Sequence, residues 1–257
     1  MTRLSIAPVK SLALQHPEEI TLERWGARGN REFYLIDEEG RLFGGAKHGP
    51  LVQVGAEFDA REGRLRLSFP DGATIDEPTA LDTQTVETNF WGRTARGRVV
   101  DGPFSEALSN FAGRPLRLVR PDRPGDANDI WPVSLVTSAS VEELARRAGR
   151  AEPLDSRRFR MLIEVGGCRP HEEDEWTGER VRVGGAVLGM PGPIPRCVVT
   201  TQDPATGIRD FPTLSEIRKY RGTPEQEIRF GVYGKVLEPG TIRLGDPVEP
   251  IEGPGSD

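Results

Sequence analysis

The chain has 257 residues and a formal net charge of −6, with 34 basic and 40 acidic side chains. A chain of this length can bury a stabilising core without disulfides, and it allows one large domain or two small ones. Its acidic balance argues against broad binding to a nucleic-acid backbone, and no apolar run approaches the ~20 residues that span a bilayer. We therefore expect neither a nucleic-acid partner nor a membrane partner.

The cysteines and histidines indicate a reducing compartment and argue against a common zinc site. The two cysteines, Cys168 and Cys197, are too few for a disulfide scaffold, and the N-terminus lacks an apolar signal segment. The three histidines are widely spaced, and the sequence contains no CxxC or HExxH pattern. These features predict a cytoplasmic protein.

Short β-like runs separated by turn residues dominate the chain. The 30 glycines and 22 prolines are spread along its length, which is typical of a fold with many turns. Several runs between them alternate apolar and polar residues at period two, as half-buried strands do. Strands are expected at residues 32–36, 51–54, 64–69, 116–119, 161–165, 181–183 and 197–201. The Asp-Glu-Glu-Gly sequence at residues 37–40 predicts a hairpin turn after the first of these.

Three short helices are expected between the strands, at residues 104–113, 140–149 and 213–220. The second has the clearest limits, because Ser140 can cap its start, Glu143 completes a capping box and Gly149 can end it. The sequence therefore predicts a mainly β fold of the α+β type with a few short helices.

Composition also suggests how the chain is divided. Residues 121–131 are rich in Pro, Gly, Asp and Asn and predict a loop, and a seam is expected near residues 99–104, after the first β-rich block. We expect a first domain at residues 1–100, a second at 101–251 and a flexible tail at 252–257.

Cys197 is the strongest candidate for chemistry on residue type alone. Pro193 and Pro195 fix the backbone before it, and the adjacent Arg196 would favour its thiolate, which a soft metal or an electrophile requires. The alternative is a buried free cysteine, a common core residue, and spacing alone favours that alternative. Cys168 has no comparable neighbours, so a structural role is expected there.

A second candidate site is a cradle for a small anion. Lys10 and Ser11 follow Pro8, and together with Arg31 and Arg160 they could bind phosphate or a similar group. Without other information, exposed surface cations are the simpler interpretation. The acidic run at residues 172–175 could bind a hard cation but is more often a solvated face.

Taken in chain order, these segments resemble a known family, the MOSC domain (the molybdenum cofactor sulfurase C-terminal domain) preceded by its N-terminal β-barrel domain. The architecture most similar to it is that of the mitochondrial amidoxime-reducing component and its bacterial relatives. The matching segments are residues 8–11 (Pro-Val-Lys-Ser), 29–31 (Gly-Asn-Arg), 47–51 (Lys-His-Gly-Pro-Leu), 138–140 (Ser-Ala-Ser), 158–160 (Arg-Phe-Arg), 173–176 (Glu-Asp-Glu-Trp), 196–207 (Arg-Cys to Thr-Gly), 230–233 (Phe-Gly-Val-Tyr) and 239–248 (Pro-Gly to Pro-Val).

The resemblance implies a fold and a site. The expected fold is an N-terminal β-barrel domain followed by a MOSC β-barrel domain. In the family the cysteine of the Arg-Cys motif ligates molybdenum, and this role falls on Cys197, a soft ligand that suits such a metal. The cofactor is expected in its molybdopterin form, whose phosphate needs cations, and the family has also been associated with pyridoxal phosphate. The residues expected to bind the cofactor are Lys10, Ser11, Arg31, Thr137, Ser138, Arg160 and Arg196.

The sequence departs from the family pattern at four places. Met161-Leu162 stands where Pro-Asn is usual, so an amide that could contact the cofactor is missing. Asn30 replaces an aspartate, Lys47 replaces an arginine and Ala7 replaces an aromatic residue. These changes leave the expected fold untouched and bear on the cofactor and the substrate.

The resemblance implies a reductase that removes oxygen from N-hydroxylated small molecules. Two cysteines cannot hold a four-cysteine iron–sulfur cluster, so electrons must come from a separate ferredoxin- or cytochrome-type protein. Asp203 and His171 are candidate proton donors by residue type only. The alternatives are sulfur transfer with Cys197 as a persulfide carrier, a cofactor-binding module without turnover, and a barrel that has lost the cofactor.

Overall fold

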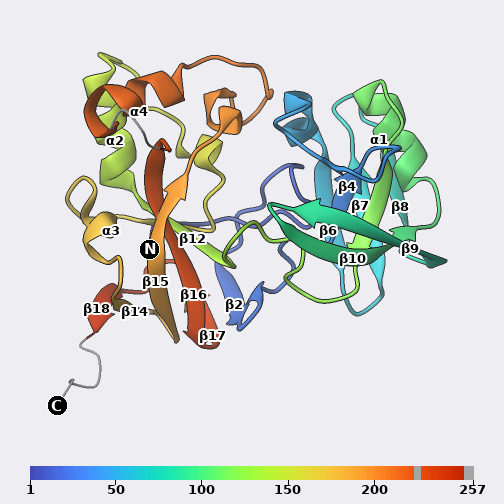
Figure 1. Ribbon diagram of the computed structural model, residues 1–257, viewed down its shortest axis with the longest axis horizontal. Coiled ribbons are helices and arrows are strands. Elements are labelled where there is room, and N and C mark those ends of the chain that lie inside the picture. Colours follow the sequence, from blue (N-terminus) through green and yellow to red (C-terminus); the bar gives the residue numbers. More distant parts are fainter. Residues whose placement is uncertain (223–226, 252–257) are drawn as a thin grey trace.

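The computed structural model describes residues 1–222 and 227–251, and it confirms the mainly β fold. Figure 1 shows two groups of strands side by side, with the first half of the chain on the right and the second half on the left. The tail expected at residues 252–257 lies outside the described residues. Within the described part, no helix combines the length and the apolar character that crossing a membrane requires.

Two antiparallel sheets form the first group. Alternation shapes them: in the Arg-Leu-Arg-Leu-Ser strand at 64–68, Leu65 and Leu67 are fully buried while Arg66 and Ser68 face solvent. The five-stranded sheet has the order β5 (Leu42–Phe43), β4 (Tyr34–Ile36), β11 (Arg117–Pro121), β10 (Arg93–Val100), β9 (Leu81–Phe90). The three-stranded sheet has the order β6 (Gly55–Asp59), β7 (Arg64–Ser68), β8 (Thr74–Pro78).

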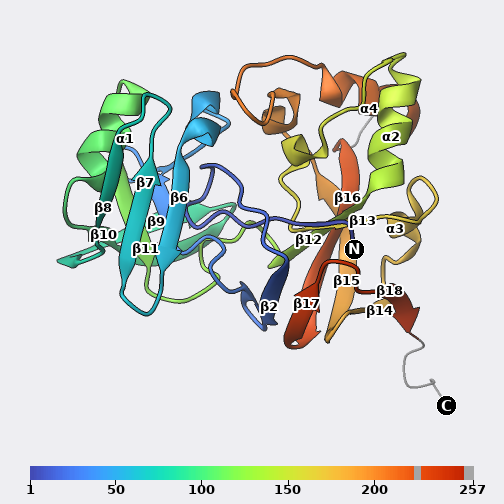
Figure 2. The same cartoon turned by 180° about the vertical axis from the view of Figure 1, so that it is seen from behind.

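The second group is built around a seven-stranded sheet, seen from behind in Figure 2. Its order is β1 (Arg3–Leu4), β13 (Ile163–Val165), β12 (Val133–Thr137), β16 (Arg229–Glu238), β15 (Ala186–Pro195), β14 (Arg180–Val183), β18 (Val248–Ile251). A small sheet of β17 (Gly240–Arg243), β2 (Glu19–Glu23) and β3 (Gly26–Ala27) adjoins it.

The three expected helices are present. They are α1 (Phe104–Ala112), α2 (Ser138–Arg147) and α4 (Thr213–Arg221). Gly113 ends α1 in the left-handed conformation with φ of 66°, as its sequence predicts. The hairpin at residues 37–40 is also confirmed, because β4 pairs with β5 directly across it.

Four local expectations were wrong. Residues 51–54 and 197–201 form 3-10 helices (Gly49–Gln53 and Val198–Thr201) in place of strands. In the second of these, the threonine hydroxyls bond back to the carbonyls three residues earlier, which competes with strand pairing. Helix α2 begins at Ser138 with Thr137 as its N-cap, so Ser140 is not the cap. The acidic run forms the short helix α3 (Glu172–Glu175), in which Glu173 is fully buried.

The N-terminal segment belongs to both groups of strands. Strand β1 is hydrogen-bonded to β13, and β2 is hydrogen-bonded to β17, so residues before 28 complete sheets of the second half. Between β1 and β2, Val9 and Leu12 pack in the core cluster of the first half, and the chain returns to that half at β4. The domain boundary at residue 100 stays a prediction, and β11 lies after it while pairing with β4 and β10.

Candidate functional site

The anion cradle is assembled by two segments that run side by side. The Lys10 amide donates to the Phe33 carbonyl (2.8 Å), and the Arg31 amide donates to the Ala7 carbonyl (2.8 Å). These bonds bring the Lys10 and Arg31 side chains to one carboxylate, Asp129. Its Oδ1 lies 2.7 Å from Lys10 Nζ and its Oδ2 lies 2.6 Å from Arg31 Nη1.

Arg160 adds a third cation from the second half of the chain. It follows the 3-10 helix Ser156–Phe159, and its Nη2 donates to the Leu12 carbonyl at 2.6 Å. Leu12 lies two residues after Lys10 in the sequence. The bond therefore connects Arg160, in the second half of the chain, to the segment that carries Lys10. The structure thus brings together three of the predicted cofactor-binding residues, which supports the cradle over scattered surface cations.

The backbone of the cradle is strained. Ser11, Arg31 and Arg160 have φ values of 75°, 56° and 51°, in the left-handed region that favours glycine. Each such residue costs of order 1–3 kcal/mol and persists only where the surroundings hold it. Only two other non-glycine residues of the described chain share this conformation: His171, and Trp91, whose ring lies 5.3 Å from Lys10 Nζ. Ser11, Arg31 and Arg160 are all predicted to bind the anion, and strained backbone of this kind clusters at functional sites.

Burial and the proximity of other cations lower the pKa values of two of the cradle cations, Lys10 and Arg160. Burial, followed by the charge of Arg31, lowers the pKa of Lys10 to about 8. Burial and Arg31 together lower the pKa of Arg160 to about 10. Burial opposes ionisation of Asp129, but Arg31 and Lys10 overcome it and hold the pKa of that carboxyl far below its usual range. Three cations share one carboxylate, so the cradle keeps a net positive charge at neutral pH.

Cys197 is exposed, so the alternative of a buried core cysteine was wrong. Its neighbour Arg196 is anchored through Nε to the Phe230 carbonyl (2.8 Å). The same guanidinium donates through Nη1 to the Phe159 carbonyl (3.1 Å) and through Nη2 to the Met161 thioether (2.9 Å). Phe159 and Met161 are the residues immediately before and after Arg160. Through Arg196, the segment that carries the Cys197 thiol is therefore hydrogen-bonded to both neighbours of the third cradle cation.

The guanidinium of Arg196 is engaged in these three bonds, and its assignment to the cofactor stays a prediction. Burial lowers the pKa of Arg196 to about 10, which still leaves it charged at neutral pH. Cys168, by contrast, is half-buried, and burial raises the pKa of its thiol above the ordinary value. The two cysteines therefore differ in exposure, and the metal-binding role of Cys197 stays a prediction.

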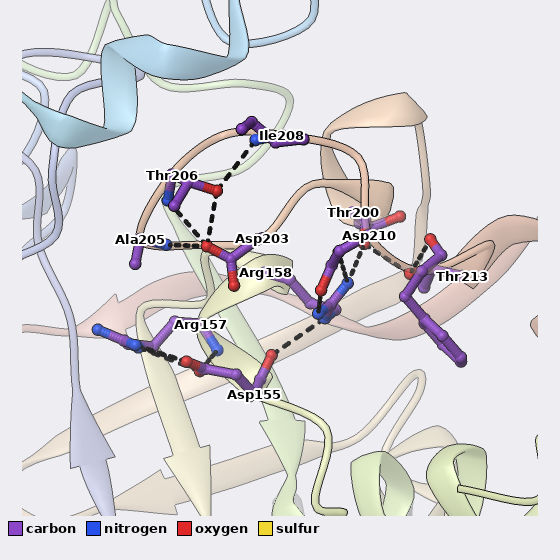
Figure 3. Close-up of polar contacts among 11 residues, drawn as sticks. Asp155, Arg157, Arg158, Thr200, Asp203, Ala205, Thr206, Ile208, Asp210 and Thr213 are labelled. Carbon is purple, nitrogen blue, oxygen red and sulfur yellow. Dashed lines mark hydrogen bonds and ion pairs between the residues drawn. The ribbon is translucent and has the colours of Figure 1, made fainter.

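A polar network holds the loop that follows Cys197 (Figure 3). Arg158 is buried and grips both carboxylate oxygens of Asp210 at 3.1 and 3.0 Å. The Thr200 carbonyl accepts from Arg158 Nη1 (3.3 Å) and from the Thr213 hydroxyl (2.6 Å). Asp203 accepts three hydrogen bonds within its own turn, which lower its pKa against the opposing effect of burial. Its carboxylate is charged and occupied, which does not favour a role as proton donor.

Thr137 and Ser138 lie at the start of α2. Thr137 is fully buried, and Glu173 Oε2 accepts from its hydroxyl at 2.7 Å and from the Ser140 hydroxyl at 2.9 Å. Burial raises the pKa of Glu173. Among the described residues, neither Thr137 nor Ser138 forms a hydrogen bond with the cradle cations, and their assignment to the cofactor stays a prediction.

His171 is not placed to act as an acid at neutral pH. Its ring packs edge-on against Phe230 with centroids 5.6 Å apart. Burial, followed by the charge of Arg221, lowers its pKa to about 4, so the imidazole is neutral.

Two site residues were missed in the sequence. Asp129 lies in the loop at residues 121–131, where nothing distinguishes it from other polar loop residues. Tyr233 on β16 pairs with Ser134 and Gly192, and burial raises its pKa, with a further increase from Asp129. Its hydroxyl therefore carries a proton at neutral pH, although the charge of Arg196 offsets part of the increase.

Comparison with known proteins gives this geometry a family. Residues 125–249 match the model of the MOSC domain, and residues 1–115 match the model of the MOSC N-terminal beta barrel domain. Mitochondrial amidoxime-reducing component 1 from Mus musculus is 36% identical, with 96% of this chain and 81% of the relative covered. The chain belongs to the MOSC family. The corresponding protein from Danio rerio is 28% identical over 98% of this chain and 84% of its own length, and the one from Homo sapiens is 26% identical over 96% and 82%.

Among solved structures, the YUAD protein from Bacillus subtilis is 16% identical, with a TM-score of 0.45 over 97% of this chain and 95% of that chain. The family resemblance seen in the sequence is thus confirmed by the family models and by the relatives.

The departures from the MOSC pattern have structural explanations. Leu162 is buried in the core cluster that contains Leu4 and Ile163, so an apolar side chain fills the position of the missing asparagine. Asn30 accepts the Ala7 amide at 2.9 Å, the bond an aspartate would also accept there. Lys47 pairs with Asp37 at 3.2 Å and takes no part in the cradle.

Proposed function

We propose that this MOSC protein is a molybdenum-cofactor-dependent reductase of N-hydroxylated small molecules. The observation that carries the proposal is the exposed thiol of Cys197, tied by Arg196 to the chain on either side of the cradle residue Arg160. Molybdopterin carries a phosphate at one end and a sulfur-bound metal at the other, so a site for it needs cations and a soft thiolate close together. The names of the curated relatives, amidoxime-reducing components, support the choice of substrate class.

Each residue then has a role that its chemistry supports. Lys10, Arg31 and Arg160 bind the phosphate by charge, and the Ser11 hydroxyl adds a hydrogen bond. Thr137 and Ser138 offer the start of α2, where backbone N–H groups favour an anion. Cys197 supplies the metal ligand, and Arg196 positions it. The bound cofactor would supply the two-electron chemistry.

The proposed reaction balances with an external reductant. An N-hydroxylated substrate takes up two electrons and two protons, its N–O bond breaks, and water leaves. Because two cysteines in the sequence cannot hold a four-cysteine cluster, we assign electron supply to a separate ferredoxin- or cytochrome-type protein. We assign proton supply to Tyr233, whose hydroxyl keeps its proton at neutral pH. We further propose that the protein works in the cytoplasm.

Sulfur transfer is the second candidate function. An exposed thiol next to a fixed guanidinium is also suited to carrying a persulfide, and Cys197 has both features. This alternative requires no molybdenum, so metal content separates the two.

The decisive experiment is elemental analysis for molybdenum, with pterin fluorescence after oxidation, on protein from a host that makes the cofactor. We expect near-stoichiometric metal and pterin in the wild type and loss of molybdenum in Cys197→Ser. The thermal midpoint should be nearly unchanged, because the side chain is exposed.

Cys168→Ser is the matched control, because it removes the other thiol and should leave the metal content unchanged. Equal metal content in the two variants would contradict the role of Cys197. A folded wild type without metal or pterin would favour sulfur transfer, to be tested by persulfide labelling of Cys197.

A further inference from the structure

One segment of the first half touches both parts of the site. It is the glycine-rich stretch at residues 44–49, Gly-Gly-Ala-Lys-His-Gly, which follows β5. At its start, a Cβ built on Gly44 would collide with the Ser11 hydroxyl of the anion cradle. The segment therefore begins in direct contact with one of the proposed phosphate-binding residues.

The same segment ends against the loop that follows Cys197. A Cβ on Gly49 would collide with the Gly207 carbonyl, and one on Gly207 would collide with the Gly49 backbone. The two backbones thus approach each other more closely than any other residue type allows. Backbone lies on both sides of this contact, so a side-chain rotation cannot relieve a substitution there.

Two hydrogen bonds secure the contact. Gln202 Nε2 donates to the Gly45 carbonyl at 2.8 Å, and this bond is buried. Gln53 Nε2 donates to the Thr206 carbonyl at 3.0 Å, from the end of the 3-10 helix that Gly49 begins. Gln202 and Thr206 lie five and nine residues after Cys197, in the turn that Asp203 closes.

We propose that residues 44–49 are a tie between the two parts of the site, and that Gly49 and Gly207 are positioning residues for Cys197. The first half of the chain then has two tasks: it supplies Lys10, Ser11 and Arg31, and it fixes the loop that carries the thiol relative to them. A cofactor held at both ends requires that separation to be set in advance. This inference rests on the proposed function of Cys197 as a metal ligand.

Gly49→Ala tests the tie, with Gly55→Ala as its matched control. A Cβ on Gly55 would meet Ser68 at 3.6 Å, an ordinary contact, and neither glycine has a positive φ. In cofactor-free protein, we expect hydrogen exchange in peptides from residues 198–210 to accelerate on the order of tenfold in Gly49→Ala, and to stay unchanged in Gly55→Ala. Alkylation of Cys197 relative to Cys168 should change in the same variant only.

The second measurement uses protein from a cofactor-competent host. We expect Gly49→Ala to retain severalfold less molybdenum than Gly55→Ala at equal folded content. If Gly49→Ala does not fold, Gln53→Ala takes its place, because it removes only the bond to Thr206. Wild-type protein without molybdenum would overturn the proposed function, while the exchange data would still decide whether the tie exists.

Unchanged exchange at residues 198–210 would overturn the tie. Faster exchange with full retention of molybdenum would overturn the positioning role. Equal acceleration throughout the chain would also overturn it, because it would show a general loss of stability.

Discussion

Asp129 sets the charge of the cradle, because Lys10 and Arg31 both bond to it. Replacing it with Asn keeps the shape and removes the charge. The charge and the hydrogen bond of Asp129 both raise the pKa of Lys10, while burial and Arg31 lower it. We therefore expect the pKa of Lys10 to fall below about 8 in Asp129→Asn. An NMR titration of protein labelled at lysine Cε measures this, since the sequence has only four lysines.

The sign of the linked stability follows from the same pKa. Folded Lys10 titrates near 8 and the ordinary lysine value is 10.5, so between these pH values the unfolded chain binds more protons. Below pH 8 the buried Lys10 is charged, and the full cost of burying that charge lowers the free energy of unfolding. As the pH rises from 8 to 10.5, Lys10 loses its proton in the folded chain first, and the free energy of unfolding increases. In Asp129→Asn the window opens at a lower pH. An unchanged Lys10 pKa, with Lys219 as the exposed reference, would contradict the charge balance described for the cradle.

Single residues show where sequence reasoning reached its limit. Lys10, Arg31 and Arg160 were identified because motifs carry them, and the structure brings them together. Asp129 was missed because its partners lie 98 and 119 residues away in the chain. The composition of its loop is that of any surface loop, so only the folded structure reveals its role.

Among the elements, the loop after Cys197 depends on the ion pair between Arg158 and Asp210. The Arg158 side chain is 2% exposed and the Asp210 side chain is 36% exposed. Removing one partner or the other should therefore lower the free energy of unfolding by different amounts. Asp210→Ala leaves the buried Arg158 guanidinium without its carboxylate partner, which costs about 3 kcal/mol of unfolding free energy. Arg158→Met leaves a carboxylate that water can reach and an apolar chain of similar length, which costs about 1 kcal/mol.

Urea unfolding with an unchanged m-value measures both costs, and the double variant gives the coupling between the two side chains. A larger loss for Arg158→Met than for Asp210→Ala would show that the hydrogen bonds from Arg158 to the Asp155 and Thr200 carbonyls outweigh the cost of an unpaired guanidinium.

Elements were predictable where local chemistry marks their ends. Helix α1 was found because Gly113 stops it, and β7 because its leucines alternate with polar residues. The 3-10 helix Val198–Thr201 was mistaken for a strand because its β-branched residues favour strands. The alternation of apolar and polar residues does not reveal the hydrogen bonds from its threonine hydroxyls to the preceding carbonyls. Helix α3 was mistaken for a solvated face because the burial of Glu173 depends on hydroxyls over 30 residues earlier.

At the scale of the whole molecule, the first 28 residues make the two halves interdependent. Leu4, Ile20, Leu22 and Ala27 lie in the same buried cluster as the strands of the second half. The amino group of Met1 donates to the Asp246 carbonyl at 2.8 Å, near the other end of the chain. A composition shift near residue 100 cannot reveal such a crossing, because β1 and β2 are short and pair with β13 and β17, which are distant in sequence.

A fragment of residues 101–251 should therefore not fold by itself. It lacks β1, which covers the edge of β13, and β2, which is paired with β17 over four residues. Leaving this edge and the apolar cluster open to water removes the cooperative core that a domain needs. We expect no cooperative thermal transition from the fragment alone, and a restored transition when a peptide of residues 1–28 is added. A peptide of scrambled sequence is the control. The fragment could instead unfold cooperatively without the peptide, at a midpoint near that of the intact chain. That result would show that residue 100 is a true domain boundary and that the second half does not need the N-terminal strands for its stability.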